Sequence, residues 1–185
     1  MSDASERIDA YKRELTLPWR PGISPAERVW MLPYPPADER RMRAQLERLD
    51  LATRESGRSW VLHDVTDAFG RWLARHEYAE AFVTDPTDLT SSVLEEFEVH
   101  VATGLRAELT GPGTGDDTVV ALVGVGALFP FVRVSRLVQA VADDIRGRLL
   151  VLFPGRFDPA GHTYRLLDAR DGFNYRALAI LPTKD

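Results

Sequence analysis

A glycine pair at the end of an apolar run is the feature of this sequence that most directly suggests ligand chemistry. The run 120–123 leads into Gly124-Val-Gly126 and then into a helix-like pattern, which is the order in which nucleotide-binding folds place a phosphate loop. Such a loop also needs a third glycine or a lysine that reaches the phosphates. Phe129 stands where the third glycine would be, and the next lysine in the sequence is Lys184. The pattern therefore predicts that both glycines serve a turn and close packing.

A carboxylate at the end of a second apolar run offers a metal-binding alternative. Asp64 closes "SWVLHD", at a position where NTPases and many nucleases hold magnesium. Together with Asp67, Asp168 and Asp171 it would form a carboxylate cluster. The same residue type also caps helices and organises tight turns. We favour caps and turns, because a metal site needs several carboxylates that converge in space.

Histidines and serines show no spacing that is typical of a catalytic or metal site. His63, His76, His100 and His162 lack the short spacing of zinc ligands. None of the serines lies in a G-x-S-x-G elbow. The sequence therefore predicts no catalytic residue, no metal site, no cofactor and no small-molecule substrate.

Aromatic and arginine side chains gather in two segments, "ALFPFVRVSR" and "LLDARDGFNY". Core packing and a turn held by Asx bonds account for most of these residues. Exposed aromatic and arginine side chains are also favoured at protein interfaces, so a partner surface is the alternative. The candidate partner-binding residues are Phe129, Phe131, Arg133, Arg170, Phe173 and Tyr175.

Strand-like and helix-like segments alternate along the chain and would position these residues. Apolar runs predict strands at 29–32, 60–65, 118–123, 149–153 and 175–181, with Pro33 ending the first and Pro154-Gly155 the fourth. Apolar residues at three- and four-residue spacing predict helices at 2–15, 38–55, 88–109 and 134–145. A further helix is expected after a cap at Thr66 or Asp67, running through Tyr78 until Pro86 breaks it.

This alternation predicts an α/β fold in one domain, 1–185. The central runs are continuously apolar, which indicates a mostly parallel sheet of about five strands with helices on both faces. The architecture would be P-loop- or Rossmann-like, without a nucleotide-binding motif. Ligands of such sheets bind beyond the carboxyl ends of the strands. Those ends would carry Pro33-Tyr34, His63-Asp64, the glycine pair and Pro154-Gly155.

Composition narrows the classes of function further. The net charge of −5 disfavours a broad nucleic-acid surface. A basic face could come only from Arg40, Arg41, Arg43 and Arg48, but acidic residues lie among them, so a solvated helix is the favoured interpretation. The chain has no cysteine, which fits a reducing cytosol, and no run long enough to span a membrane.

Longer segments of the sequence resemble a known family. "SWVLHDVTDAF", "VLEEFEVHVATGL", "DDTVVALVGVGALFPFVRVSRLVQAVADDIRGRLLVLFPG" and "YRLLDARDGFNYRALAI" are similar to the BrxB family of the bacterial BREX phage-resistance systems. The resemblance runs from about Arg58 to Ile180. It divides the domain into an N-terminal helical and proline-rich part, 1–57, and a BrxB-like core, 58–181.

The resemblance implies a cytoplasmic component that is encoded with a BREX ATPase, a DNA methyltransferase and the alkaline-phosphatase-like PglZ protein. It implies no catalytic residue. The expected function is a non-enzymatic scaffold that binds another BREX protein, PglZ above all, and meets DNA only through the complex. The alternative is a degenerate nucleotide- or metal-binding module, related to NTPases or nucleases, that uses Asp64.

Overall fold

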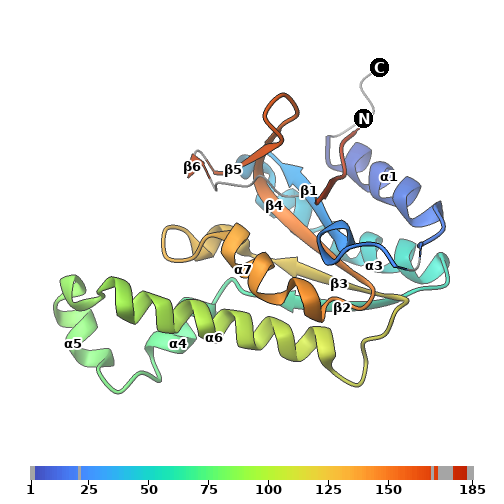
Figure 1. Cartoon of the computed structure of the whole chain (residues 1–185). Coiled ribbons are helices and arrows are strands. Elements are labelled where there is room, and N and C mark those ends of the chain that lie inside the picture. The colour runs from blue at the N-terminus through green and yellow to red at the C-terminus, as the bar shows by residue number, and fades with distance from the viewer. Residues whose placement is uncertain (1–2, 21, 168, 171–176, 183–185) are drawn as a thin grey trace.

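Five parallel strands form the centre of the molecule in the order β2-β3-β4-β1-β7 (Figure 1). The computed structural model describes residues 3–20, 22–167, 169–170 and 177–182. Two short strands continue the sheet at the far end of β4: β5 pairs antiparallel with β4, and β6 pairs antiparallel with β5. The strands are β1 (Val29–Tyr34), β2 (Ser59–Asp64), β3 (Thr118–Val123), β4 (Arg148–Asp158), β5 (Thr163–Leu166), β6 (Ala169–Arg170) and β7 (Leu178–Ala179).

Helices cover both faces of this sheet (Figure 1). On one face, α1 and α3 pack Ile8, Tyr11 and Leu49 against β1 and β4. On the other face, α4, α6 and α7 pack against the opposite side chains of the same strands. The α-helices are α1 (Asp3–Thr16), α2 (Glu39–Arg43), α3 (Leu46–Glu55), α4 (Ala68–Leu73), α5 (Ala79–Thr84), α6 (Ser91–Thr110) and α7 (Val134–Val141).

The pattern of burial explains why the apolar runs become central strands. Every residue of β1 and β3 is buried, because helices lie on both sides of each strand. In contrast, β2 lies at the edge of the sheet and is only partly buried. The predicted α/β class with a mostly parallel, two-sided sheet is confirmed.

Three predicted helices are shorter or divided. The single helix expected at 38–55 is wrong, because the chain turns at Ala44 and Gln45. As a result α2 directs side chains to the carboxyl ends of the parallel strands, while α3 packs on α1. The helix expected to run from Thr66 or Asp67 until Pro86 is divided into α4 and α5: α4 ends at Leu73, and the chain folds back so that Phe82 of α5 contacts His76, with ring centroids 4.9 Å apart. The helix expected to reach 145 ends at Val141 and continues as a 3-10 turn.

Two prolines that were expected to end strands lie within them. Pro33 belongs to β1 and pairs with Phe153. Met31, two residues earlier, accepts a bond from Ile180 beside β7, so the side of Pro33 that lacks an N–H also faces β7. That strand pairs only with Trp30 and Met31, and no ladder bond is lost at the proline.

The fourth strand continues past Pro154-Gly155 to Asp158 because β5 pairs with its extension. Gly155 lies opposite Leu166, and a Cβ at Gly155 would overlap the carbonyl oxygen of Arg165. The glycine thus permits the close approach of β5 rather than ending β4. The last strand, expected at 175–181, is β7 at Leu178–Ala179, and positions 175 and 176 lie outside the described residues.

Candidate functional site

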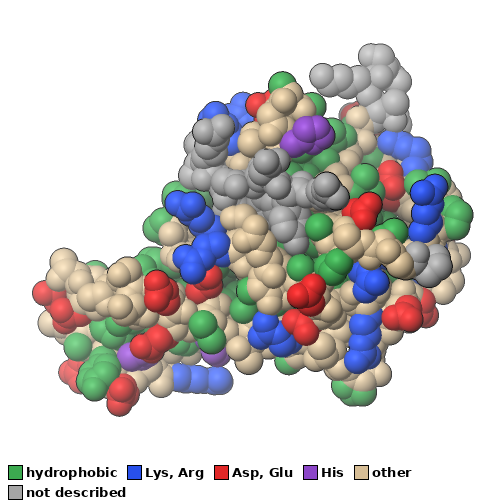
Figure 2. Space-filling view, in the orientation of Figure 1, with side chains coloured by type: hydrophobic (Ala, Val, Ile, Leu, Met, Phe, Trp, Pro, Cys, Tyr) green, Lys and Arg blue, Asp and Glu red, His purple; other side chains and the backbone are tan. Residues whose placement is uncertain are grey.

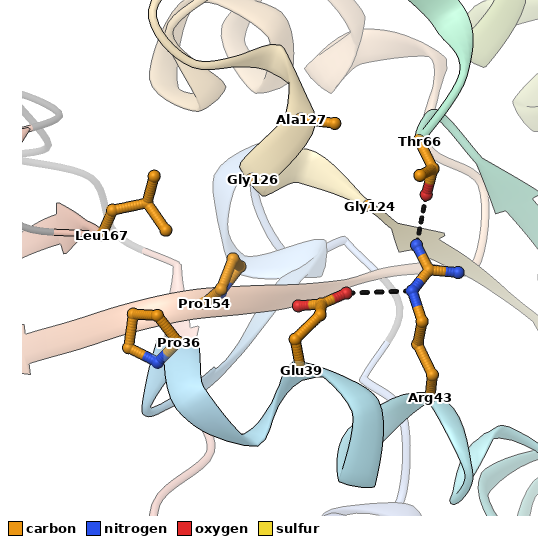
Figure 3. Close-up of a pocket in the computed structure, with 9 residues that line it drawn as sticks. All are labelled: Pro36, Glu39, Arg43, Thr66, Gly124, Gly126, Ala127, Pro154 and Leu167. Atoms are coloured by element: carbon orange, nitrogen blue, oxygen red, sulfur yellow. Dashed lines mark hydrogen bonds and ion pairs between the residues drawn. The ribbon is translucent and has the colours of Figure 1, made fainter.

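A pocket of about 290 Å³ lies at the carboxyl edge of the parallel strands (Figure 3). It is the place where α/β sheets of this kind bind ligands. Residues that follow β1, β2, β3 and β5 contribute to it, together with Pro154 of β4. The lining consists of Pro36, Glu39, Arg43, Thr66, Gly124, Gly126, Ala127, Pro154 and Leu167.

Arg43 is the centre of a polar network in this pocket. Its Nη1 lies 2.9 Å from Oδ2 of Asp64, and its Nε lies 3.0 Å from Oε1 of Glu39. A further guanidinium nitrogen donates to the hydroxyl of Thr66. Figure 3 shows the guanidinium between Glu39 and Thr66, with the arginine side chain rising from α2. One cation therefore joins α2 to the segment that follows β2.

Asp64 has few acceptor positions left for a ligand. Its Oδ1 accepts from the backbone N–H of Thr66 at 2.9 Å and from the Thr66 hydroxyl at 2.5 Å, while Oδ2 accepts from Arg43. Burial alone would raise the pKa of Asp64, but the bonds from Arg43 and Thr66 outweigh it and lower the pKa to about 2. The bond to Asp64 in turn raises the pKa of Arg43. Both groups are fully charged at neutral pH and neutralise each other.

Tyr34, the last residue of β1, fixes the second carboxylate. Its hydroxyl donates to Oε2 of Glu39 at 2.5 Å, so the two oxygens of Glu39 bond to different partners. Burial and the hydrogen bond to Glu39 raise the pKa of Tyr34 above its usual range. The tyrosine is therefore a neutral donor that holds Glu39 toward Arg43.

The glycine pair serves the turn that the sequence predicts. Gly124 has φ +81°, a conformation that side chains with a Cβ rarely adopt. A Cβ at Gly124 would also lie 2.7 Å from the backbone nitrogen of Thr66. At Gly126 a Cβ would lie 3.1 Å from Cγ of Pro154. Both glycines let neighbouring strand ends approach closely, and the 3-10 turn that follows is only four residues long.

The other acidic and histidine residues do not converge on this pocket. Asp67 lies 3.3 Å from Arg71 in an exposed ion pair, and positions 168 and 171 are outside the described residues. Within the part of the chain that the structure describes, no group of three or more potential ligands could hold a metal ion. The nearest histidine, His63, faces α6, with Nδ1 4.0 Å from Oε1 of Glu108.

The candidate partner-binding residues that the structure describes differ in how far they are exposed. Phe129 is 44% exposed, and Arg133 is exposed at the start of α7. Phe131 is half-buried and stacks on Phe69, with ring centroids 4.2 Å apart and planes 11° apart. That contact packs Phe131 against α4, and a part for Phe131 in partner binding stays a prediction.

The side chains of the remaining three candidates lie outside the described part of the structure. Arg170 lies in β6, where its side chain is outside the description, and Phe173 and Tyr175 lie outside the described residues. Their role stays a prediction.

Sequence reasoning missed two residues of the pocket. Glu39 and Arg43 were expected on a solvated helix, with a basic nucleic-acid face as the alternative for Arg43, yet both line the pocket at the carboxyl ends of the strands. A signal was available: they follow the first strand by a few residues, as pocket residues of α/β sheets commonly do. Two other arginines of that segment bond elsewhere, Arg41 to Asp38 and Arg48 to Gln45 and Ser5.

Sequence similarity links this chain to a protein family. No curated protein and no solved structure shows significant similarity to the chain. Among the described helices, none combines the length and the apolar character that a membrane span requires. The family model described as BREX protein BrxB matches residues 79–180, a match that starts later than the expected Arg58 but covers more than half of the sequence. The chain therefore belongs to the BrxB family of BREX phage-defence proteins.

Proposed function

We propose that this protein is a non-catalytic, cytoplasmic accessory component of a BREX system and acts by binding another BREX protein. The internal ion pair at the carboxyl edge is the observation that carries the proposal. Asp64 is the residue that a magnesium-dependent or nucleotide-dependent module would use, and Arg43 and Thr66 already bind its oxygens. A ligand would have to break that network, whereas a binding protein benefits from its rigidity.

A surface near this edge has the composition of a protein-binding site. Phe129 presents an aromatic ring to solvent, and Arg133 lies four residues further along the chain. Aromatic and arginine side chains dominate the binding energy of many interfaces. We propose that Phe129 and Arg133 contact the partner, together with Arg170, Phe173 and Tyr175, and that the partner is the PglZ-type protein.

The distribution of charge supports a protein partner over nucleic acid. Figure 2 shows acidic and apolar side chains together at the end of the molecule that α5 and the start of α6 form. The stretch 77–105 contains no lysine or arginine. An acidic surface repels phosphate backbones. Its seven acidic residues are Glu77, Glu80, Asp85, Asp88, Glu95, Glu96 and Glu98.

The test is to tag the protein in its native operon, purify it at moderate and then high salt, and identify the proteins that remain in fixed proportion. We expect one BREX protein, PglZ, to remain, and Phe129→Ala to release it. Val83→Ala is the matched control, because Val83 is more exposed, at 72%, and lies on α5. Recovery of the tagged protein alone, at every salt concentration, would refute the proposal.

A thermal melt with magnesium and ATP tests the alternative function. A ligand present at a hundred times its Kd stabilises the folded state by about 2.7 kcal/mol, so a nucleotide-binding module would melt at a clearly higher temperature. We expect no change in the melting temperature at millimolar ligand. A stabilisation that Asp64→Asn abolishes would overturn the non-catalytic assignment.

A further inference from the structure

One long edge of the sheet is open. In the sheet order β2 is the terminal strand, and no described residue pairs with its outer side. The backbone N–H groups of Ser59 and Val65 donate to β3 partners Asp117 and Val123. Because residues along a strand alternate between its two sides, the odd-numbered residues bond to β3. The N–H and C=O groups of Trp60 and Leu62 therefore point outward, away from the sheet.

This edge lacks the features that normally prevent a second strand from pairing. Natural edges carry lysine, proline, a bulge or a very short strand. The strand β2 is six residues long and runs in unbroken register with β3. Residues 59–63 contain no proline, lysine or arginine, and Leu62 is 45% exposed. Such an edge can accept an added strand from another chain.

A cavity of about 230 Å³ lies beside the carboxyl end of β2, between this strand, α4 and α6. Arg71 and Arg75 contribute positive charge to it. Arg71 pairs with Asp67, but Arg75 makes no ion pair within the described residues. Gly104 of α6 keeps the cavity open, because a Cβ there would already touch the ring of His63 at 3.8 Å. The complete lining is His63, Asp64, Val65, Ala68, Arg71, Arg75, His100, Val101 and Gly104.

The cavity lies where a side chain of a strand added to β2 would project. A strand added to β2 would run about 4.8 Å from it. Side chains directly opposite each other in a sheet project from the same face, so the added residue opposite His63 would project toward α6 and into the cavity. The only acidic group in the lining is Asp64, whose oxygens bond to Arg43 and Thr66. A carboxylate on the added strand would thus be the counter-ion of Arg75.

We propose that the edge of β2 binds an extended segment of the partner protein as an additional strand, with an aspartate or glutamate of that segment in the cavity beside Arg75. The identity of the partner as a BREX protein rests on the proposed function above. Backbone bonds to Trp60 and Leu62 supply affinity, and the charged cavity selects the acidic segment.

A second copy of this chain fits the edge less well. When a two-fold axis relates two antiparallel copies of β2, residues that lie opposite each other project from the same face of the sheet. The axis must therefore pass between a residue of one copy and the same residue of the other copy. Centring on Leu62 places Val61 of one copy opposite His63 of the other, and centring on Val61 places Ser59 there. Neither Val61 nor Ser59 brings the negative charge that would complement Arg75.

The test uses the tagged protein with its retained BREX partner. Leu62→Pro removes the outward N–H without disturbing the bonds to β3, and Leu62→Ala is the control that keeps this N–H. We expect the proline variant to bind the partner about tenfold more weakly, since it leaves an acceptor of the added strand unpaired. The alanine variant should lose less affinity than the proline variant. Hydrogen exchange of the segment 59–65 should slow in the wild-type complex.

The cavity is tested by variants that do not depend on a proline in a strand. Arg75→Glu should weaken binding about tenfold or more, and Gly104→Leu should also weaken it by filling the cavity. Ala107→Leu is the control for the glycine, because Ala107 is exposed on the same helix and does not line the cavity.

Each outcome separates the hypotheses. A partner that is retained equally by Leu62→Pro, Arg75→Glu and Gly104→Leu would overturn strand addition and leave the proposed function intact. A wild-type protein that retains no BREX protein would refute the proposed function and this partner with it. A concentration-dependent dimer that Leu62→Pro abolishes would replace the partner segment by a second copy.

Discussion

Replacing Arg43 by methionine should destabilise the protein at neutral pH and leave it nearly unaffected in strong acid. The substitution keeps an unbranched apolar stem but removes the guanidinium group that bonds to Asp64, Glu39 and Thr66. Asp64 and Glu39 would then be two carboxylates at one edge of the sheet without their counter-ion. The folded state should lose the part of the lowering of the Asp64 pKa that is due to Arg43, while the bonds from Thr66 remain.

The magnitude follows from that pKa. Its fall from 3.8 to about 2 corresponds to about 2 kcal/mol at 1.36 kcal/mol per pKa unit. The Asp64 side chain is 40% exposed, and solvent screening reduces the contribution to about 1 kcal/mol. For a chain of this length, a loss of about 1 kcal/mol lowers the melting temperature by about 2–4 °C.

The pH dependence has a definite sign. A carboxylate whose folded pKa is lowered stabilises the fold above its ordinary pKa, and this contribution disappears as the pH falls through the folded value. The stabilisation by Asp64 is therefore complete above about pH 4 and is lost toward pH 2. The melting temperatures of the wild type and Arg43→Met should differ at pH 7 and converge near pH 2.

Thermal melts at a series of pH values, monitored by circular dichroism, provide the measurement. Arg41→Met is the control, because Arg41 is 75% exposed and forms a local ion pair with Asp38. Combination with Asp64→Asn should make the effect of Arg43→Met much smaller. Equal melting temperatures at pH 7 would refute the reasoning, and an unchanged difference at pH 2 would assign the effect to packing instead.

Two further predictions concern the turn and the core. Gly124→Ala should destabilise the fold by about 3 kcal/mol or more, through the positive φ and the overlap with Thr66, whereas Gly113→Ala, which meets nothing within 4 Å, should leave the urea midpoint nearly unchanged. Tyr11→Phe should cost about 1 kcal/mol in urea unfolding because it removes the buried 2.6 Å hydrogen bond to Thr53 between α1 and α3; an equal loss in Tyr78→Phe, at a position 58% exposed, would contradict this explanation.

The central strands could be predicted because local composition decides them. The run 118–123 is apolar at nearly every position and becomes fully buried β3. The same reasoning identified, to within one residue, where β2 and β3 end, and Asp64, Gly124 and Pro154 do lie together near the carboxyl ends of the parallel strands. Parallel strands bring their carboxyl ends together, so a correct fold class is sufficient to predict that juxtaposition.

The pairing of Arg43 with Asp64 could not be predicted in this way. The two residues are 21 positions apart, and their contact depends on the turn at Ala44 and Gln45 that separates α2 from α3. The course of β4 through Pro154 posed the same difficulty, because the strand continues only where β5 comes to pair with it. Local signals predict where a strand can end, but pairing with a distant segment decides whether it does.

The internal cation changes what the carboxyl edge of this sheet can do. In sheets of this type the edge binds anionic ligands through free backbone N–H groups and an unpaired cation. Here the cation belongs to α2 and is bonded to two carboxylates, and Pro36 and Pro154, which have no N–H to donate, line the pocket. The edge therefore stabilises the fold by joining α2 to β2. Because Asp64 ends β2, the same ion pair also fixes the strand whose outer side is open, and Arg43→Met should weaken partner binding at β2 as well as stability.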